Sequence, residues 1–167
     1  VSGTSFSSFL KRNIFEPLQM EHSYVYSFEH DSIRENQLDG YRLYRGRSHL
    51  KIRNTINDAI VGDKNVYTTI EDLFKWTHGL NTLKLLTKES LDLMYATGET
   101  VNGREVPYGF GFRIDTKRKN SIYHHGKWNG FSTGLTRYLE DDLVVIVLEH
   151  TSYKTMKSLN ETIKKIV

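Results

Sequence analysis

The pattern with the clearest chemical meaning is Tyr-His-His-Gly-Lys-Trp-Asn-Gly-Phe at residues 123–131. It stands between an aromatic, glycine-spaced segment at residues 108–114 and the apolar run at residues 143–148. If His124 and His125 lie in a strand, their side chains alternate, so that one faces a site and the other faces away. Gly126 is informative because glycine weakens a strand interior and often marks the close approach of a ligand. The pattern predicts one wall of an acyl-transfer site.

The nucleophile that such a wall should face is harder to find. Acyl transfer by serine needs a hydroxyl activated by a base, and backbone N–H groups aimed at the developing oxyanion. One known arrangement is Ser-x-x-Lys at the start of a helix. The chain matches it at Ser8 with Lys11 and at Ser48 with Lys51. A pattern of two fixed residues often arises by chance, and packing already explains the helix around Ser8. We expect neither serine to be a nucleophile.

Other chemistries are disfavoured by composition. The chain has no cysteine, which excludes disulfides, thiolate catalysis and cysteine-based zinc sites. A metal site at the histidine pair would need ligands such as Asp63, Glu149 or His150, and no known metal-binding spacing connects them. No metal and no cofactor are expected. No run approaches the roughly 20 apolar residues that a membrane helix needs.

A basic, aromatic stretch at residues 41–53 is the only candidate for nucleic-acid binding. The Lys and Arg are otherwise scattered, and the net charge is +3. Interleaved basic and aromatic residues can bind RNA, but a solvated strand or hairpin face is the favoured interpretation. No nucleic-acid partner is expected.

The elements that must position the histidine segment have an α+β order. Helices are predicted over residues 4–16, after a cap at Thr68 or Thr69, and after a cap at Thr87. Short strands are predicted at residues 24–26 and 41–44, with a turn at Asp39-Gly40 and a hairpin turn at Asn102-Gly103. Four strands follow, at residues 108–114, 121–125, 131–139 and 143–149. The short Glu140-Asp141-Asp142 connection makes the last two antiparallel.

A final helix is predicted over residues 155–167, where apolar residues recur at helical spacing. The expected fold class is therefore α+β, with a helix-rich first half, an antiparallel sheet of about three to four strands and a C-terminal helix. Residues 1–100 are the mostly helical or irregular part, and residues 101–167 hold the sheet strands and the terminal helix.

Three parts of the chain resemble one known family, in that family's order. Residues 2–20 resemble its SGxSFxxFLxxxIFxPLGM helix, with Gln19 where glycine is usual. Residues 62–76 resemble its GxGGxYSTxxDLxKW segment, with Lys64 and Asn65 replacing small residues. Residues 108–112 and 124–131 resemble its YGxGW and HxGxxxGF strands. The chain thus resembles the C-terminal part of the serine β-lactamase-related hydrolases, the class C β-lactamase, DD-peptidase and esterase superfamily.

The resemblance implies a partial β-lactamase/transpeptidase-like fold and roles for particular residues. His124 takes the place of lysine in the family's Lys-Thr-Gly triplet, lining an edge strand and helping to orient the substrate. His125 and Gly126 complete the triplet, and Gly126 allows close approach of the substrate. The backbone N–H of Lys127 becomes the second oxyanion donor. Trp128 and Phe131 either shape the pocket rim or are packing residues.

The resemblance also implies that the catalytic Ser-x-x-Lys and Tyr-x-Asn elements precede a segment like residues 1–3. We therefore expect one incomplete domain, residues 1–167, from a serine hydrolase that cleaves an amide, β-lactam or ester bond in a small-molecule or peptide substrate. Alone, it is expected to be inactive; the alternative is a non-catalytic binding module that keeps the fold. Residues 143–148 would form an exposed edge that pairs with the missing N-terminal half or a second copy. Relatives are usually exported by bacteria, but the sequence leaves the compartment unknown.

Overall fold

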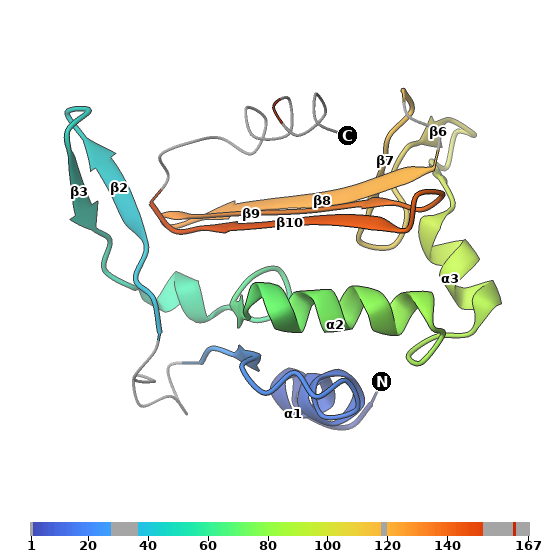
Figure 1. The fold of residues 1–167 in the computed structure, drawn as a ribbon, viewed down its shortest axis with the longest axis horizontal. Helices are drawn as coiled ribbons and strands as arrows, with labels where there is room; N and C mark the ends of the chain where they lie inside the picture. The colour runs from blue at the N-terminus through green and yellow to red at the C-terminus, as the bar shows by residue number, and fades with distance from the viewer. Residues whose placement is uncertain (1, 28–36, 118–119, 152–161, 163–167) are drawn as a thin grey trace.

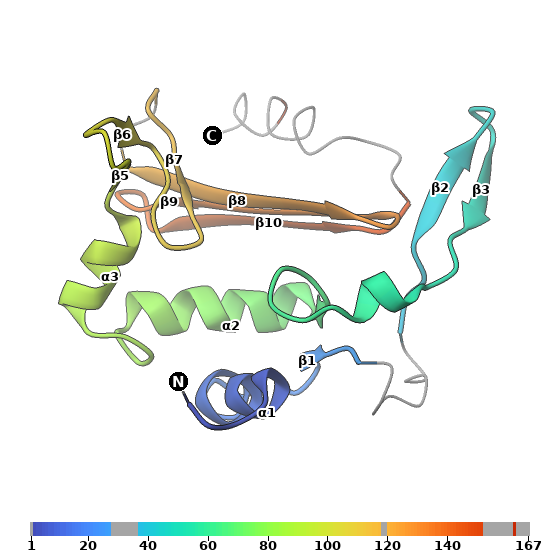
Figure 2. The ribbon, with the colours of Figure 1, turned by 180° about the vertical axis from the view of Figure 1, so that it is seen from behind.

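The computed structural model describes residues 2–27, 37–117, 120–151 and 162. A four-stranded antiparallel sheet lies along the long helix α2 (Ile70–Asn81), and helix α1 (Phe6–Leu10) lies on the opposite side of α2 (Figures 1 and 2). Helix α3 (Lys88–Tyr95) closes one end of these layers. The helices are therefore segregated from the sheet, as an α+β chain requires.

The sheet has the order β10-β9-β8-β7, and every neighbouring pair is antiparallel. Its strands are β7 (Arg113–Ile114), β8 (Ser121–Trp128), β9 (Phe131–Tyr138) and β10 (Leu143–Glu149). Three smaller antiparallel pairs join β1 (Tyr24–Val25) to β4 (Val66–Tyr67), β2 (Tyr41–Tyr44) to β3 (Ser48–Lys51), and β5 (Gly98–Glu99) to β6 (Glu105–Val106). The predicted α+β class and number of sheet strands are confirmed.

The helix starts follow the predicted caps. The Thr69 hydroxyl accepts from the Asp72 N–H at 3.2 Å, and the Thr87 hydroxyl accepts from the Ser90 N–H at 3.3 Å. The first helix begins at Phe6 and continues beyond Leu10 as a π-helical turn, η1 (Lys11–Phe15). It ends just before Pro17, as expected from the lost N–H of proline.

Two clusters of buried apolar residues hold the layers together. One packs the first helix on the chain that follows it: Phe15, Leu18, Met20 and Val25. The other packs the sheet on the helical layer: Phe112, Ile122 and Leu135. Trp76 of α2 packs against both clusters, so the indole couples the sheet to the N-terminal helix.

Several predictions for the loops were wrong. Only Arg113–Ile114 of the predicted strand 108–114 is a strand, because Gly111 has φ +83° and the Phe110 N–H bonds to the carbonyl of Met94 at 3.0 Å. Asp39-Gly40 belongs to an irregular segment that leads into β2 and is not a turn. The segment 22–61 also holds a short 3₁₀ helix, η2 (Ile56–Ala59), where no helix was expected. The predicted helix 155–167 lies outside the described residues except for Thr162.

Candidate active site

Strand β8 carries all four predicted site residues and is three residues longer than expected. It pairs with β9 along its whole length, and Asn129-Gly130 joins the two strands with φ values of +46° and +92°. Positive φ at both positions is the geometry of a type I′ hairpin turn, which matches the natural twist of the strands.

The other side of β8 is covered only at its start. Strand β7 pairs with Ile122 and Tyr123 and goes no further. In the described part of the chain, residues 124–128 therefore form an open strand edge. The predicted placement of His124 and Gly126 on an edge is consistent with this arrangement.

The register fixes the direction of the backbone groups on that edge. In a two-residue hairpin the residues flanking the turn, here Trp128 and Phe131, exchange both hydrogen bonds, and the pattern alternates from there. The N–H groups of Gly126 and His124 then point to β9, while that of Lys127 points to the open edge. The same alternation directs the carbonyl of Ser121 away from β9, where it accepts from the Asp115 N–H at 3.0 Å.

The two histidines lie on opposite faces. His124 shares the helix-facing side of the sheet with Ile122, whereas His125 shares the other side with Tyr123, whose ring centroid is 4.9 Å away. The exposed imidazole of His124 is hydrogen-bonded through Nδ1 to the carbonyl of Gly111. A carbonyl only accepts, so Nδ1–H is the donor in this hydrogen bond.

Packing against β9 disfavours any side chain larger than glycine at position 126. A Cβ at this position would lie 2.7 Å from the hydroxyl oxygen of Thr133, its cross-strand neighbour on β9. The glycine therefore has a structural cause that the sequence did not disclose. Close approach of a ligand at this position stays a prediction.

Asp58 is a residue of the site that the sequence analysis missed. Its carboxylate accepts from the indole N–H of Trp128 at 2.5 Å and from the side-chain amide of Asn129 at 2.8 Å. The Thr55 backbone N–H donates to it at 2.5 Å as part of a capping box for η2, and the Thr55 hydroxyl donates to it at 2.9 Å. The signal that could have found Asp58 is Thr-x-x-Asp at residues 55–58, a variant of the helix-start pattern.

Trp128 is held from two directions. Asp58 fixes its indole N–H, and the ammonium of Lys64 lies 4.6 Å from the ring centroid, a cation–π contact. The side chain of Lys64 also pairs with Asp63 at 2.7 Å. Trp128 is nevertheless 47% exposed, so it presents an oriented aromatic surface at the end of the open edge.

Burial and hydrogen bonding act in opposite directions on Asp58, which is only 8% exposed. Burial raises the pKa of its carboxyl, but the hydrogen bonds from Thr55, Trp128 and Asn129 outweigh burial and hold the pKa below its usual value. The group that orients Trp128 is therefore a carboxylate at neutral pH.

The two Ser-x-x-Lys matches do not form nucleophile–base pairs. The Ser8 hydroxyl accepts from the Ser5 hydroxyl at 2.9 Å, and Lys11 is 3.9 Å from Glu16. Ser48 and Lys51 stand three apart on β3, where their side chains point to opposite faces, and Lys51 pairs with Asp39 at 2.7 Å. Within the described residues, neither serine is hydrogen-bonded to its lysine.

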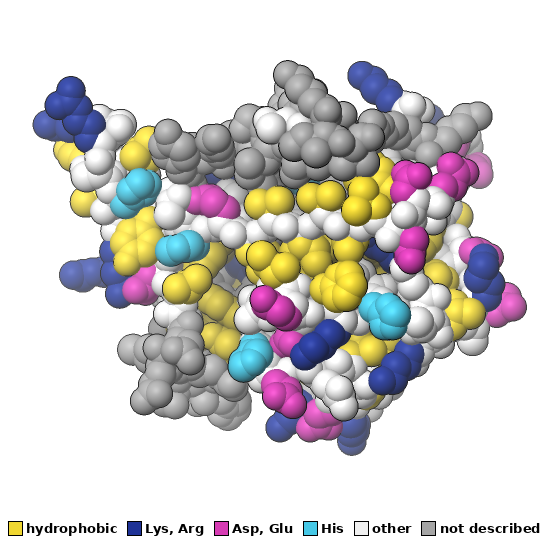
Figure 3. Space-filling model, in the orientation of Figure 1, with side chains coloured by type: hydrophobic (Ala, Val, Ile, Leu, Met, Phe, Trp, Pro, Cys, Tyr) yellow, Lys and Arg dark blue, Asp and Glu magenta, His cyan; other side chains and the backbone are white. Residues whose placement is uncertain are grey.

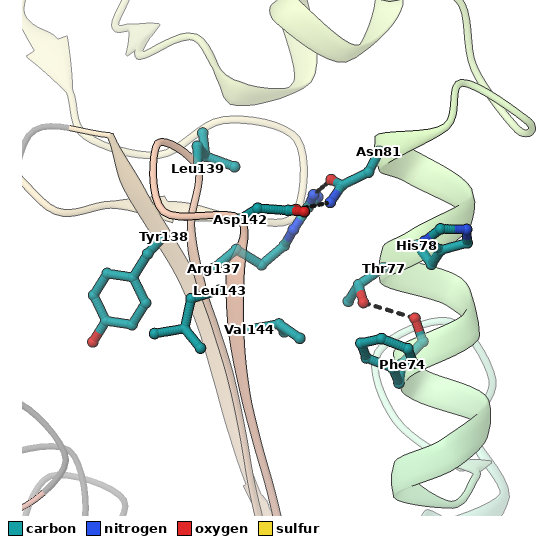
Figure 4. A pocket seen from close by; sticks show the side chains of 10 residues that line it. All are labelled: Phe74, Thr77, His78, Asn81, Arg137, Tyr138, Leu139, Asp142, Leu143 and Val144. Atoms are coloured by element: carbon teal, nitrogen blue, oxygen red, sulfur yellow. Dashed lines mark hydrogen bonds between the residues drawn. The ribbon is translucent and has the colours of Figure 1, made fainter. Parts of the chain in front are cut away.

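A pocket near the β10 edge of the sheet, away from the open edge of β8, contains none of the predicted site residues (Figure 4). It lies between α2 and the turn from β9 to β10. The buried guanidinium of Arg137 borders it and is hydrogen-bonded to Tyr95 and Asn81, and Asn81 donates to Asp142 at 2.9 Å. Among the described residues, no three His, Asp or Glu side chains are grouped to hold a metal ion. No described helix is both long and apolar enough to cross a bilayer.

Comparison with known proteins identifies the class. The sequence profile of the Beta-lactamase family matches residues 1–167, so the chain belongs to the Beta-lactamase family. It is 27% identical over 165 residues to penicillin-binding protein 4* of Bacillus subtilis (strain 168), covering 92% of this chain and 37% of that protein.

Solved structures share the fold. A penicillin-binding protein from Bacillus halodurans superposes with a TM-score of 0.79 at 18% identity, over 99% of this chain and 51% of that one. FmtA from Staphylococcus aureus superposes with a TM-score of 0.77 at 19% identity, over 99% of this chain and 44% of that one. The D-amino acid amidase of Ochrobactrum anthropi SV3 superposes with a TM-score of 0.70 at 18% identity, over 99% of this chain and 50% of that one. The chain thus has the β-lactamase/transpeptidase-type fold and spans about half, or less, of the length of these proteins.

Proposed function

We propose that this chain supplies the substrate-binding wall of a serine hydrolase that cleaves an amide, β-lactam or ester bond in a small molecule or peptide. The observation that carries the proposal is the open edge of β8. It combines the backbone N–H of Lys127, which points outward, with the imidazole of His124 and the oriented indole ring of Trp128. An extended acyl chain laid along such an edge can hydrogen-bond to the strand.

Each residue of the edge has a separate task in this proposal. The Lys127 N–H stabilises the oxyanion of the tetrahedral intermediate, because a preorganised donor costs no reorganisation when charge develops. Nε2 of His124 orients a polar group of the substrate or of a neighbouring catalytic side chain. His125, whose side chain is on the far face, contributes through its backbone position. Trp128 bounds the site where the edge ends.

The nucleophile in this proposal comes from a Ser-x-x-Lys element in a preceding segment, together with a Tyr-x-Asn element. Two described features support an external source: neither local serine is hydrogen-bonded to its lysine, and the chain covers 37–51% of its relatives' lengths. The same preceding segment, or a second copy, would pair with the outer edge of β10.

Covalent labelling tests the proposal. A fluorophosphonate or β-lactam probe should label the protein when the preceding segment is present and should leave the 167-residue chain unlabelled. Mass spectrometry would locate the adduct on the upstream serine. Labelling of the chain alone that disappears in Ser8→Ala would overturn the proposal and make Ser8 the nucleophile. An absence of labelling and of amidase or esterase activity in the longer protein would favour the alternative, a non-catalytic binding module.

A further inference from the structure

The β2–β3 hairpin has no part in the proposed site. It projects from the end of the sheet (Figure 1), and every residue from 42 to 51 is exposed. Its base is firmly attached. The Tyr41 N–H donates to the carbonyl of His150 at 2.7 Å, and the two rings pack edge to face at 5.8 Å. The hairpin is therefore an ordered arm that contributes little to the core.

Positive charge is concentrated on this arm. Residues 40–57 contain five of the chain's 23 Lys and Arg and none of its 20 Asp and Glu, although the whole chain has a net charge of only +3. Lys51 pairs with Asp39 at the base. The other four, Arg42, Arg45, Arg47 and Arg53, make no ion pair with the described residues. Figure 3 shows Lys and Arg side chains gathered at the tip.

Large apolar side chains accompany this charge. Leu43, Tyr44 and Leu50 are all exposed. The register places Arg42 opposite Leu50, and strand alternation puts Tyr44 on the same face as both. Tyr41 is on the other face, against His150, so the face with Arg42, Tyr44 and Leu50 is turned away from the sheet. Exposed apolar side chains rimmed by charged groups are typical of an interaction surface.

We propose that the β2–β3 hairpin docks on the surface of an anionic lipid bilayer. Arginine binds lipid phosphates in the planar geometry that its guanidinium favours. Tyrosine prefers the headgroup level, where its ring is in an apolar layer and its hydroxyl is hydrated. Leucine side chains reach the boundary of the acyl chains. The proposal is independent of the hydrolase activity.

The apolar side chains favour a bilayer over a nucleic acid. Both partners attract the arginines, and both attractions weaken as salt rises. Only the bilayer offers an apolar layer in which Leu50, on the outward face, is removed from water. Loss of Leu50 should therefore weaken docking on a bilayer and leave binding to a nucleic acid almost unchanged.

Vesicle sedimentation of the protein tests the proposal. Vesicles of equal parts phosphatidylcholine and phosphatidylglycerol should carry the protein down, and pure phosphatidylcholine vesicles should not. Each basic residue near an anionic surface contributes a roughly fivefold change in partition, so Arg45→Gln with Arg47→Gln should lower binding about 20-fold or more. The matched control removes two exposed arginines elsewhere, Arg12→Gln with Arg104→Gln, and should leave most of the binding intact.

A third variant separates the two anionic partners. Leu50→Ser should lower vesicle binding several-fold and keep the affinity for a DNA duplex unchanged. Circular dichroism would verify that each variant is folded. The proposal is overturned if the unmodified protein does not bind the anionic vesicles. It is overturned as well if the Arg12 and Arg104 variant loses as much binding as the Arg45 and Arg47 variant. It is also overturned if the leucine variant binds vesicles normally.

Discussion

Asp58 and Trp128 are separated by 70 positions in the sequence and joined by a 2.5 Å hydrogen bond from the indole N–H to the carboxylate. This bond attaches η2 to the end of β8, beside the strand edge proposed to bind substrate. Asp58 also receives hydrogen bonds from Thr55 and Asn129, so one buried carboxylate organises both the short helix and the β8–β9 turn. The orientation of Trp128 therefore depends on a residue from a distant loop.

Replacing Asp58 by Asn should destabilise the protein by about 2 kcal/mol, because hydrogen bonds to a buried charged group are worth about 1.5–3 kcal/mol. The amide keeps the shape but brings an N–H group toward donors that need an acceptor. Urea unfolding monitored by circular dichroism measures the change. Asp92→Asn is the matched control, since Asp92 is an exposed partner of Lys88 and should have little effect. Equal effects of the two substitutions would contradict the role given to Asp58.

Stability should also fall in acid. Asp72 is 0% exposed; burial raises the pKa of its carboxyl, but contacts with Lys75, Ser23 and His22 outweigh burial and lower it below the usual value. The pKa of Asp58 is lowered in the same way. Both folded-state pKa values lie below the unfolded value of about 3.9, so the unfolded state binds more protons in that window. The stabilisation is present above pH 4 and is lost as pH falls through the folded pKa values.

Urea unfolding at a series of pH values measures this dependence. The free energy of unfolding should decline below about pH 4, and the decline should be shallower in Asp58→Asn and in Asp72→Asn. An unchanged slope in both variants would show that other carboxylates control the acid transition.

The sequence predicted the parts of the fold that depend on local rules. Thr69 and Thr87 cap their helices, and the alternating run at residues 121–138 forms the central hairpin, because caps and strand patterns act within a few residues. The contact between Asp58 and Trp128 could not be predicted, because no local sequence pattern shows which distant loop packs against the end of a strand. The segment 108–112 was misjudged for a similar reason: its aromatic residues resemble a strand, yet Gly109 packs on the end of α3.

A substitution at Gly40 tests how the β2–β3 hairpin packs against the β8–β9 turn. A Cβ at Gly40 would lie 2.0 Å from the carbonyl oxygen of Asn129, and backbone atoms cannot move aside cheaply. Gly40→Ala should therefore cost about 1–3 kcal/mol, the range for overpacking, and should disturb the β8–β9 turn. Gly46→Ala is the control, because Gly46 has φ +70° but no atom near its missing Cβ. Thermal unfolding compares the two; a larger loss in Gly46→Ala would indicate that backbone conformation matters more than the close contact.

The outer edge of β10 should control self-association. It ends the sheet on the side away from β8, and apolar side chains line it on the front face (Figure 3). Light scattering after size-exclusion chromatography should find the 167-residue chain as a dimer or larger species. Val145→Lys places a charge on this strand, outside the packed cluster that includes Val144 and Ile146, and should restore a monomer. A stable monomer of the unmodified chain would contradict the pairing.

Two substitutions at Lys127 distinguish a catalytic role of its backbone N–H from a role of its side chain. Its N–H points to the open edge rather than to β9, so proline at this position removes the proposed oxyanion donor without breaking the ladder. In a longer protein that supplies the proposed upstream serine, Lys127→Pro should lower kcat about 100- to 1,000-fold, the usual cost of losing one such donor. Lys127→Ala keeps the N–H and should leave kcat nearly unchanged. Near-UV circular dichroism would verify that the proline variant keeps its packing. Equal losses in the two variants would assign the effect to the ammonium, and normal turnover in Lys127→Pro would remove this N–H from the mechanism.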